Sequence, residues 1–190
     1  MLHISYGDVN FDACNCESAL RERFPSKTSQ SFIDLLVKKG NEKAKAQSLF
    51  AYLGLANLLE ENGIDTKALD ISRTREGKPY FENSDIFFSI SHTDKYFAVA
   101  IANSAVGIDI ESKCLTDEKM QSIAKRYFLP SEAEYACDRD SFLRVWTFKE
   151  AYAKMTGVPL SGTMSNVSAT DDSIKKIHKK YNDAIICVCM

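Results

Sequence analysis

The sequence predicts an α+β fold made of two similar halves. Three observations support this prediction: a helix is followed by strands, helices and strands then come again in the same order, and the strands do not alternate one by one with helices as in βαβ folds. We place the halves at residues 1–104 and 105–190, although no internal repeat of sequence accompanies the repeated order.

The elements of the first half follow from hydrophobic spacing and turn residues. Leu2 to Tyr6 is expected to form an opening strand, and residues 17–24 a brief helix. Residues 42–59 carry the longest helical pattern, with apolar side chains three and four residues apart, and Asn62-Gly63 ends that helix. Residues rich in β-formers then predict strands at 69–72, 80–81, 86–90 and 96–102, with a turn over 76–79.

The second half is interpreted by the same criteria. A short connection at 103–105 leads into an apolar run at 106–110, so the strands 96–102 and 106–110 are expected to pair as a hairpin. Acidic first turns, a proline and a closing glycine predict helices at 116–127, from Pro130, and at 141–155. Two or three further strands are expected after residue 166, including 174–180 and 184–188.

Composition narrows the possible functions. The chain has 190 residues, 26% of them charged, and a formal net charge of −2. A nucleic-acid-binding domain is typically basic, which this chain is not. The lysines at 175–180 are interpreted as protection of an edge strand, with contact to an acidic partner protein as the alternative. No apolar run reaches the ~20 residues of a membrane span, and the start of the chain does not resemble an export signal. We therefore expect a cytoplasmic protein with neither nucleic-acid nor membrane partners.

The six cysteines include two C-x-C pairs, Cys14 with Cys16 and Cys187 with Cys189; the other two are Cys114 and Cys137. In a reducing compartment they are expected to be free thiols. A four-thiolate zinc site is the alternative, but its usual spacing is C-x₂-C. Buried thiols that behave as small apolar side chains are therefore the favoured interpretation.

Two carboxylates stand close together in Val106-Gly107-Ile108-Asp109-Ile110-Glu111. Side chains two residues apart on a strand share a face, so Asp109 and Glu111 point the same way. Like charges in this arrangement either face water or share a bound cation. The segment alone favours a solvent-exposed face for these two carboxylates, because antiparallel sheets often have one face in contact with water.

Two further segments carry charged or nucleophilic residues. Glu150 and Lys154 form an i,i+4 pair on a predicted helix, which alone indicates an exposed salt bridge of small energetic effect, and Trp146 is expected to pack in the core. The neighbours Ser91 and His92 are weak support for a catalytic serine, since its base usually comes from elsewhere in the chain. Together, the carboxylates, the histidine and the lysines suggest a magnesium–phosphate site.

Five blocks, in this order, resemble the signature of the 4′-phosphopantetheinyl transferases of the Sfp type. Four of them match the family's patterns: G-K-P at 77–79, S-x-S-H at 89–92, G-[IV]-D-[IL]-E at 107–111 and W-[ST]-x-K-E-[AS]-x-x-K at 146–154. The fifth, at 126–132, is similar to the family's R-F-F-x-x-x-E but has Tyr127 at the second position. The resemblance implies a monomer built as a pseudo-dimer of two similar α+β halves. Coenzyme A would contact the first half, and the second half would hold the metal and the catalytic residues.

The resemblance also implies an activity. Such enzymes transfer the 4′-phosphopantetheine arm of coenzyme A to a serine of an apo acyl or peptidyl carrier protein, and they release adenosine 3′,5′-bisphosphate. The reaction depends on Mg²⁺, with Mn²⁺ as a possible substitute. The serine would attack the β-phosphorus in line, and a carboxylate or water would remove its proton.

The family's functional residues can be carried over one by one. Asp109, Glu111 and Glu150 match metal ligands, and Glu150 is also expected to be needed for catalysis. Lys149 and Lys154 match lysines that contact the coenzyme A phosphates and help the transfer. The remaining matches are phosphate contacts at Ser91 and His92, an adenine-side pocket at Gly77, Lys78 and Pro79, and a candidate general base at Glu132, with Glu134 or water as alternatives.

One position departs from the family. A basic residue, usually arginine, often contacts the 3′-phosphate, but Gln47 stands near that place here. Lys43 or Lys45 is the expected substitute, although a lysine is a point charge and cannot form the bidentate hydrogen bonds of an arginine.

Two other functions stay open beside the transferase. One is a catalytically silent module that binds carrier proteins or coenzyme A, and the other is a different magnesium-dependent enzyme that acts on phosphates. The intact set of Asp109, Glu111, Glu150 and Lys154 argues against the first. The combination of S-x-S-H with W-T-x-K-E-A-x-x-K argues against the second.

Overall fold

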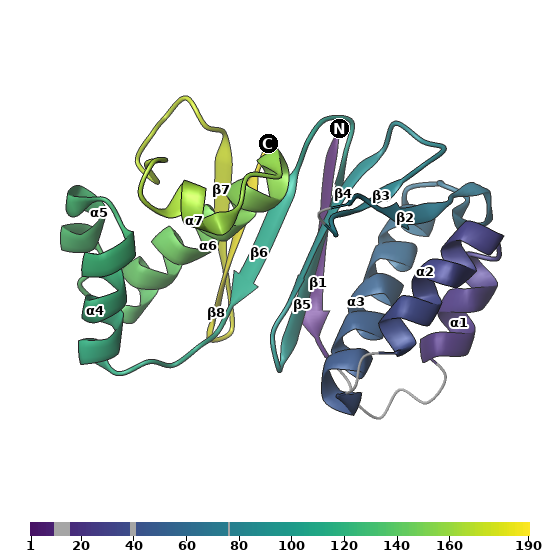
Figure 1. Cartoon of the computed structure of the whole chain (residues 1–190), viewed down its shortest axis with the longest axis horizontal. Coiled ribbons are helices and arrows are strands. Elements are labelled where there is room, and N and C mark those ends of the chain that lie inside the picture. The colour runs from purple at the N-terminus through teal and green to yellow at the C-terminus, as the bar shows by residue number, and fades with distance from the viewer. Residues whose placement is uncertain (10–15, 39–40, 76) are drawn as a thin grey trace. The chain divides into compact units, whose positions relative to one another are not determined.

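The structure is a computed structural model that describes residues 1–9, 16–38, 41–75 and 77–190. Contacts between residues divide the chain into two units, unit 1 (Met1–Ala105) and unit 2 (Val106–Met190). Each unit contains both helices and an antiparallel sheet, which confirms the predicted α+β class (Figure 1). In the described part of the chain, no helix combines the length and apolar character needed to cross a membrane.

Unit 1 is a three-stranded antiparallel sheet with helices packed against it. The strand order is β1-β5-β4, and the bounds are β1 (Leu2–Asp8), β4 (Phe87–His92) and β5 (Tyr96–Ala102). The helices are α1 (Cys16–Arg23), α2 (Lys27–Val37) and α3 (Glu42–Glu61), and a 3₁₀ turn (Thr66–Ala68) leads to a small hairpin of β2 (Ile71–Arg73) and β3 (Pro79–Phe81).

The longest helix of unit 1, α3, organises its core. Asn41 caps this helix by accepting hydrogen bonds from the amides of Lys43 and Ala44. Leu55 and Leu59 are fully enclosed and pack in the same apolar cluster as Val99 and Ile101 of β5. The helical spacing of apolar residues in 42–59 therefore predicted both the helix and its buried face.

Unit 2, like unit 1, begins with a strand, continues with helices and ends with two paired strands. Its strand order is β6-β8-β7, with β6 (Gly107–Glu111), β7 (Lys176–Tyr181) and β8 (Ala184–Cys189). Between β6 and β7 lie α4 (Asp117–Tyr127), α5 (Pro130–Tyr135), α6 (Arg139–Thr156) and α7 (Leu160–Met164). In both units the first strand pairs with the last strand, and the longest helix packs against this pair.

The predicted hairpin of residues 96–102 with 106–110 is wrong. β5 pairs with β1 on one side and β4 on the other, so it has no free edge for a third strand. β6 pairs instead with β8, whose six residues are all buried. Short connection length suggested a hairpin, but the partner of β6 comes from the other end of unit 2.

Two helices were not predicted. α2 begins with the polar run Lys27 to Ser31, a composition typical of loops, yet Ser26 caps it and Phe32, Ile33 and Leu36 are buried beneath it. α7 is a single short turn of helix that follows Pro159. The helical conformation of both segments therefore depends on the tertiary packing of a few apolar residues and not on a local sequence pattern.

The five described cysteines are free thiols, whereas Cys14 lies outside the described residues. Cys187 and Cys189 lie on the same face of β8 and are fully buried. A hydrogen bond with Cys189 and burial both raise the pKa of the Cys187 thiol. The interpretation of this pair as buried thiols is confirmed.

Gly107 marks the point where α6 lies closest to β6. A Cβ atom added to Gly107 would lie 1.9 Å from the carbonyl oxygen of Ala151 and 2.6 Å from the amide nitrogen of Met155. Gly107→Ala is therefore expected to push α6 away from β6 and to lower the free energy of unfolding by about 3 kcal/mol, as measured in urea. Gly162→Ala in α7 is the control, because its Cβ would meet only a flexible Val158 carbon at 3.3 Å. Equal stability of the two variants would contradict this close packing.

Candidate active site

The charged residues of the candidate site come from β6 and α6. Asp109 and Glu111 lie two residues apart on β6, and Glu150 and Lys154 lie one turn apart on α6. The helix can approach the strand this closely because Gly107 has no side chain. The two elements that pack most closely in unit 2 therefore also bring these four side chains together.

Asp109 is buried and paired with Lys154. Its side chain is only 8% exposed, and its Oδ1 accepts a hydrogen bond from Nζ of Lys154 at 2.7 Å. The same Nζ donates to the carbonyl oxygen of Ile108 at 3.1 Å. The expectation that Asp109 lies on a solvent-exposed face is therefore wrong, because α6 covers this face of β6.

Glu150 and Glu111 add two carboxylates to this cluster. Burial, with the negative charges of Asp109 and Glu111 nearby, raises the pKa of Glu150, while Lys154 acts in the opposite direction. Oε1 of Glu111 accepts hydrogen bonds from the backbone amides of Ser112 and Lys113, each at 2.9 Å. The three acids repel one another, which is the condition a shared cation would relieve.

The donor set fits a hard divalent cation. Three carboxylates suit Mg²⁺ or Mn²⁺, whereas Zn²⁺ prefers histidine and cysteine. Across the ranges that the structure describes, no three His, Cys, Asp or Glu side chains converge closely enough to hold a metal ion as they stand. Binding of a cation by Asp109, Glu111 and Glu150 together would therefore require at least one of these side chains to move.

Lys149 and Glu132 form an ion pair inside unit 2. Both side chains are 0% exposed, and Nζ of Lys149 lies 2.7 Å from Oε2 of Glu132. Lys149 also donates to the carbonyl oxygen of Val167, while Glu132 accepts from the amides of Leu129 and Ala169. Burial lowers the pKa of Lys149, and Glu132 counteracts this effect. The pair therefore joins α5 and the segment 167–169 to α6.

A pocket opens beside Glu111. It has a volume of about 90 Å³ and is lined by Glu111, Lys113, Leu115, Ile123, Phe142, Leu143 and Trp146. Trp146 stacks on Phe142 with the ring centroids 6.1 Å apart. From the sequence, Trp146 was expected to pack in the core. The pocket was not predicted, because the residues of its wall come from before, within and after α4.

In unit 1, Ser91 and His92 lie at the end of β4, near the first turns of α3. Ser91 is 8% exposed, and Nε2 of His92 lies 3.4 Å from the hydroxyl of Ser48. Gln47 donates to a carboxylate oxygen of Asp94 at 2.8 Å, and Lys43 pairs with the other oxygen at 2.7 Å. The position where an arginine was expected is therefore occupied by an amide bonded to an acid.

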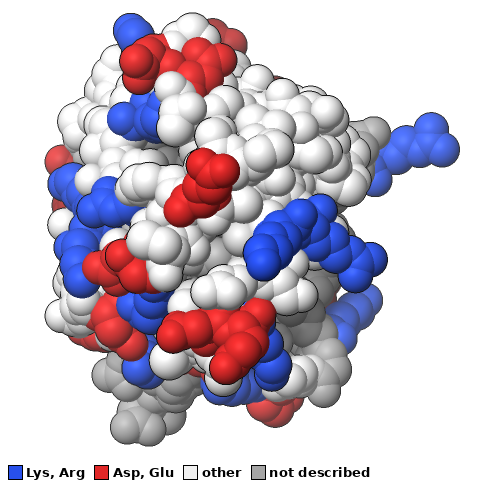
Figure 2. All heavy atoms as spheres, turned by 90° about the vertical axis from the view of Figure 1, so that its left-hand side faces the viewer, with Lys and Arg blue, Asp and Glu red and all other residues white. Residues whose placement is uncertain are grey.

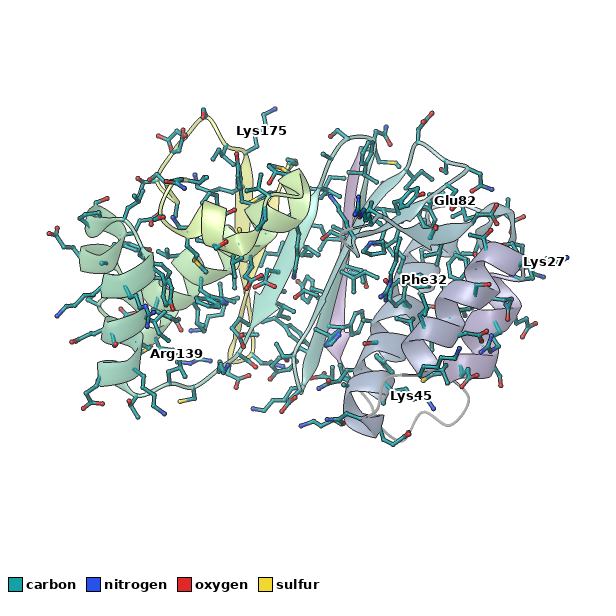
Figure 3. All side chains as sticks on the ribbon, in the orientation of Figure 1. Lys27, Phe32, Lys45, Glu82, Arg139 and Lys175 are labelled. Atoms are coloured by element: carbon teal, nitrogen blue, oxygen red, sulfur yellow. The ribbon has the colours of Figure 1, made fainter. Side chains whose placement is uncertain are left out.

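Lys45 lies in the first turns of α3 (Figure 3). Its ammonium is 3.9 Å from the carboxylate of Glu42. Gly77, Lys78 and Pro79 belong to the turn and strand of the β2–β3 hairpin, whereas Glu76 lies outside the described residues. Gly77 has a φ of 90°, a conformation that favours glycine, and burial lowers the pKa of Lys78.

Comparison with known proteins points to one superfamily. The sequence pattern of the 4′-phosphopantetheinyl transferase superfamily matches residues 105–189. The chain is 31% identical over 166 residues to the 4′-phosphopantetheinyl transferase gsp of Aneurinibacillus migulanus, an alignment that covers 82% of this chain and 68% of the relative. A putative 4′-phosphopantetheinyl transferase of Haemophilus influenzae is 31% identical with the same coverage.

A third relative is similar over a shorter stretch. The 4′-phosphopantetheinyl transferase Sfp of Bacillus subtilis is 32% identical over 114 residues, which is 55% of this chain and 49% of the relative. The chain thus spans about two thirds of the first two relatives and about half of this one.

Proposed function

The chain belongs to the 4′-phosphopantetheinyl transferase superfamily, as its five sequence blocks predicted, and from this we propose that it transfers the 4′-phosphopantetheine arm of coenzyme A to a serine of an apo acyl or peptidyl carrier protein. The serine oxygen would bond to the β-phosphorus, and the bond from that phosphorus to the bridging oxygen would break. Adenosine 3′,5′-bisphosphate would leave. The observation that carries the proposal is the cluster of Asp109, Glu111, Glu150 and Lys154 in unit 2.

We assign metal binding to Asp109, Glu111 and Glu150. Bound Mg²⁺, or Mn²⁺ in its place, would neutralise charge on the pyrophosphate of coenzyme A. Lys154 is 30% exposed and already bonded to Asp109, so its ammonium lies at the rim of the cluster. We assign it to the bridging oxygen, which gains negative charge as adenosine 3′,5′-bisphosphate leaves.

For the buried pair of Lys149 and Glu132 we propose a role other than the phosphate contact and general base that the family resemblance implies. Lys149 would have to leave Glu132 to touch a phosphate, and Glu132 would have to leave Lys149, Leu129 and Ala169 to accept a proton. We therefore propose that the pair holds α5 and the segment 167–169 in place. The proton of the attacking serine would then pass to Glu134, which is exposed on α5, or to water.

The pocket beside Glu111 suits the arm itself. Its base is apolar, with Phe142 and Trp146 in the wall, and Glu111 and Lys113 form its polar side. A phosphate held at the carboxylates would place the following carbon chain at this pocket. We propose that part of the arm packs against Trp146.

Unit 1 supplies the other contacts with coenzyme A in this proposal. Ser91 and His92 would contact phosphate, Lys43 or Lys45 the 3′-phosphate, and Gly77, Lys78 and Pro79 the adenine. The support is the placement of polar and basic side chains near the end of β4 and the start of α3. A monomer in the cytoplasm stays our prediction.

The described residues on the face shown in Figure 2 carry basic and acidic side chains interspersed. A protein that binds a nucleic-acid backbone through charge usually gathers basic residues on one surface. The face shown therefore does not have the concentrated basic surface that would favour a nucleic-acid backbone.

The transfer itself is tested by intact mass spectrometry. The purified chain is incubated with coenzyme A, Mg²⁺ and a panel of apo acyl and peptidyl carriers, and at least one carrier is expected to gain the mass of the phosphopantetheine arm. A carrier whose acceptor serine is replaced by alanine is the control and should gain nothing. If no carrier gains mass while the chain still binds coenzyme A in calorimetry, the chain is a silent binding module.

A further inference from the structure

Arg139, the first residue of α6, joins parts of unit 2 that lie far apart in the sequence (Figure 3). Its Nη2 donates to the carbonyl oxygen of Ser112, directly after β6, at 2.9 Å. The same nitrogen donates to the carbonyl oxygen of Asp183, in the turn between β7 and β8, at 2.6 Å. One guanidinium thus fixes two backbone segments at the same end of the sheet, a task suited to its rigid set of donors.

The segment that Arg139 holds also orients Glu111. The backbone amides of Ser112 and Lys113 both donate to Oε1 of Glu111, at 2.9 Å each. The peptide carbonyl of Ser112 accepts from Arg139 on the other side of the same turn. A shift of this turn would therefore turn the Glu111 carboxylate.

We propose that Arg139 is a positioning residue that keeps the Glu111 carboxylate oriented toward a divalent cation. The proposal rests on the proposed function in taking Glu111 as a metal ligand. Arg139 lies eleven residues before Glu150 on the same helix, roughly 16 Å along its axis. It therefore acts through Ser112 and not by contact with the cluster around Glu150.

A neighbouring ion pair provides the matched control. Lys180 of β7 pairs with Asp140, the residue after Arg139, and the Lys180 side chain is 54% exposed. Asp140 also lies 3.5 Å from Nη1 of Arg139. Lys180→Ala removes one cation from the same corner of unit 2 but does not remove the Arg139 nitrogen that donates to Ser112. An effect of charge alone would appear in both variants, whereas an effect of position would appear only when Arg139 is changed.

The test measures metal binding without coenzyme A or carrier. Mn²⁺ is titrated into the full chain and followed by electron paramagnetic resonance for wild type, Arg139→Gln, Arg139→Lys and Lys180→Ala. Loss of a residue that orients a metal ligand typically weakens metal binding about 10- to 100-fold. We expect the Kd for Mn²⁺ to rise about tenfold in Arg139→Gln, to rise less in Arg139→Lys, and to stay near wild type in Lys180→Ala.

Hydrogen exchange of the Ser112 and Lys113 amides, measured without metal, gives an independent readout. Exchange is expected to be faster in Arg139→Gln and unchanged in Lys180→Ala, and Arg139→Lys replaces the glutamine variant if that one does not fold. Wild-type Mn²⁺ affinity together with wild-type exchange would overturn the proposal. If wild type itself binds no Mn²⁺, the proposed metal site fails and the role of Arg139 toward a cation fails with it. Faster exchange in Arg139→Gln would then show only that Arg139 holds the turn after β6.

Discussion

Glu150→Gln is expected to slow phosphopantetheine transfer by about a hundredfold or more while making the protein without added metal more stable to heat. The rate should fall because the variant loses one of three carboxylates proposed to hold the cation, and removal of one such electrostatic group typically costs about 10²–10³ in rate. The measurement is the initial rate of mass gain by an apo carrier at a fixed Mg²⁺ concentration.

The gain in stability follows from the pKa of Glu150. Burial and the charges of Asp109 and Glu111 raise this pKa in the folded chain. A carboxyl group with a raised pKa stabilises the fold while protonated, and this contribution is lost as pH rises through the folded-state pKa. At neutral pH the ionised group therefore opposes folding. Glutamine removes the charge, so the difference in unfolding temperature between variant and wild type should shrink as pH is lowered.

Glu118→Gln is the control for Glu150→Gln. Glu118 is an exposed acid in the first turn of α4, so this substitution removes one negative charge from unit 2 without touching the cluster. Transfer and stability should both stay near wild type in the control. A Glu150→Gln variant that transfers at the wild-type rate, or that unfolds at a lower temperature with a chelator present, would refute the assigned cluster.

Lys149→Met is expected to lower the free energy of unfolding by about 3–5 kcal/mol, because it leaves the carboxylate of Glu132 buried without its cation. Glu132→Leu should destabilise in the same way, since it leaves Lys149 charged and enclosed. The double variant should be less destabilised than the sum of the two single variants, because neither charge then remains. Backbone groups of Leu129, Val167 and Ala169 would still lose partners, at about 1–3 kcal/mol each if they stay buried.

Urea unfolding of the single and double variants measures this coupling. Lys125→Met on the exposed surface of α4 is the control and should change stability little. Transfer by a folded double variant separates the two possible roles of the pair. Persistent transfer would support a holding role, whereas loss of transfer from a folded, coenzyme A-binding double variant would favour direct contact of Lys149 or Glu132 with the substrates. Additive losses of stability would contradict the ion pair.

Local patterns were sufficient to predict most elements of the fold. The apolar spacing in 42–59, the closing Gly157 and the acidic first turn at Asp117 and Glu118 predicted α3, α6 and α4 because each signal lies within its own helix. The hairpin from 96–102 failed for the opposite reason. Which strand pairs with β6 depends on β8, and no local pattern at 103–110 contains that information.

For the candidate site, too, local patterns predicted some features and the tertiary fold determined the others. Strand periodicity predicted that Asp109 and Glu111 share a face, but the covering of that face by α6 decided that Asp109 is buried. The contacts of Arg139 and the pair of Lys149 with Glu132 join residues 17 to 44 positions apart. Such contacts require the tertiary fold, so the sequence could name several of these residues without predicting their partners.

The central claim is that Asp109, Glu111 and Glu150 hold the cation of the transfer reaction. Crystals grown with coenzyme A and Mn²⁺, with diffraction recorded at the manganese absorption edge, test it most directly. We predict one strong anomalous peak within bonding distance of all three carboxylates and of the coenzyme A pyrophosphate. A peak bonded to none of these three side chains, in crystals whose density shows coenzyme A, would contradict the account.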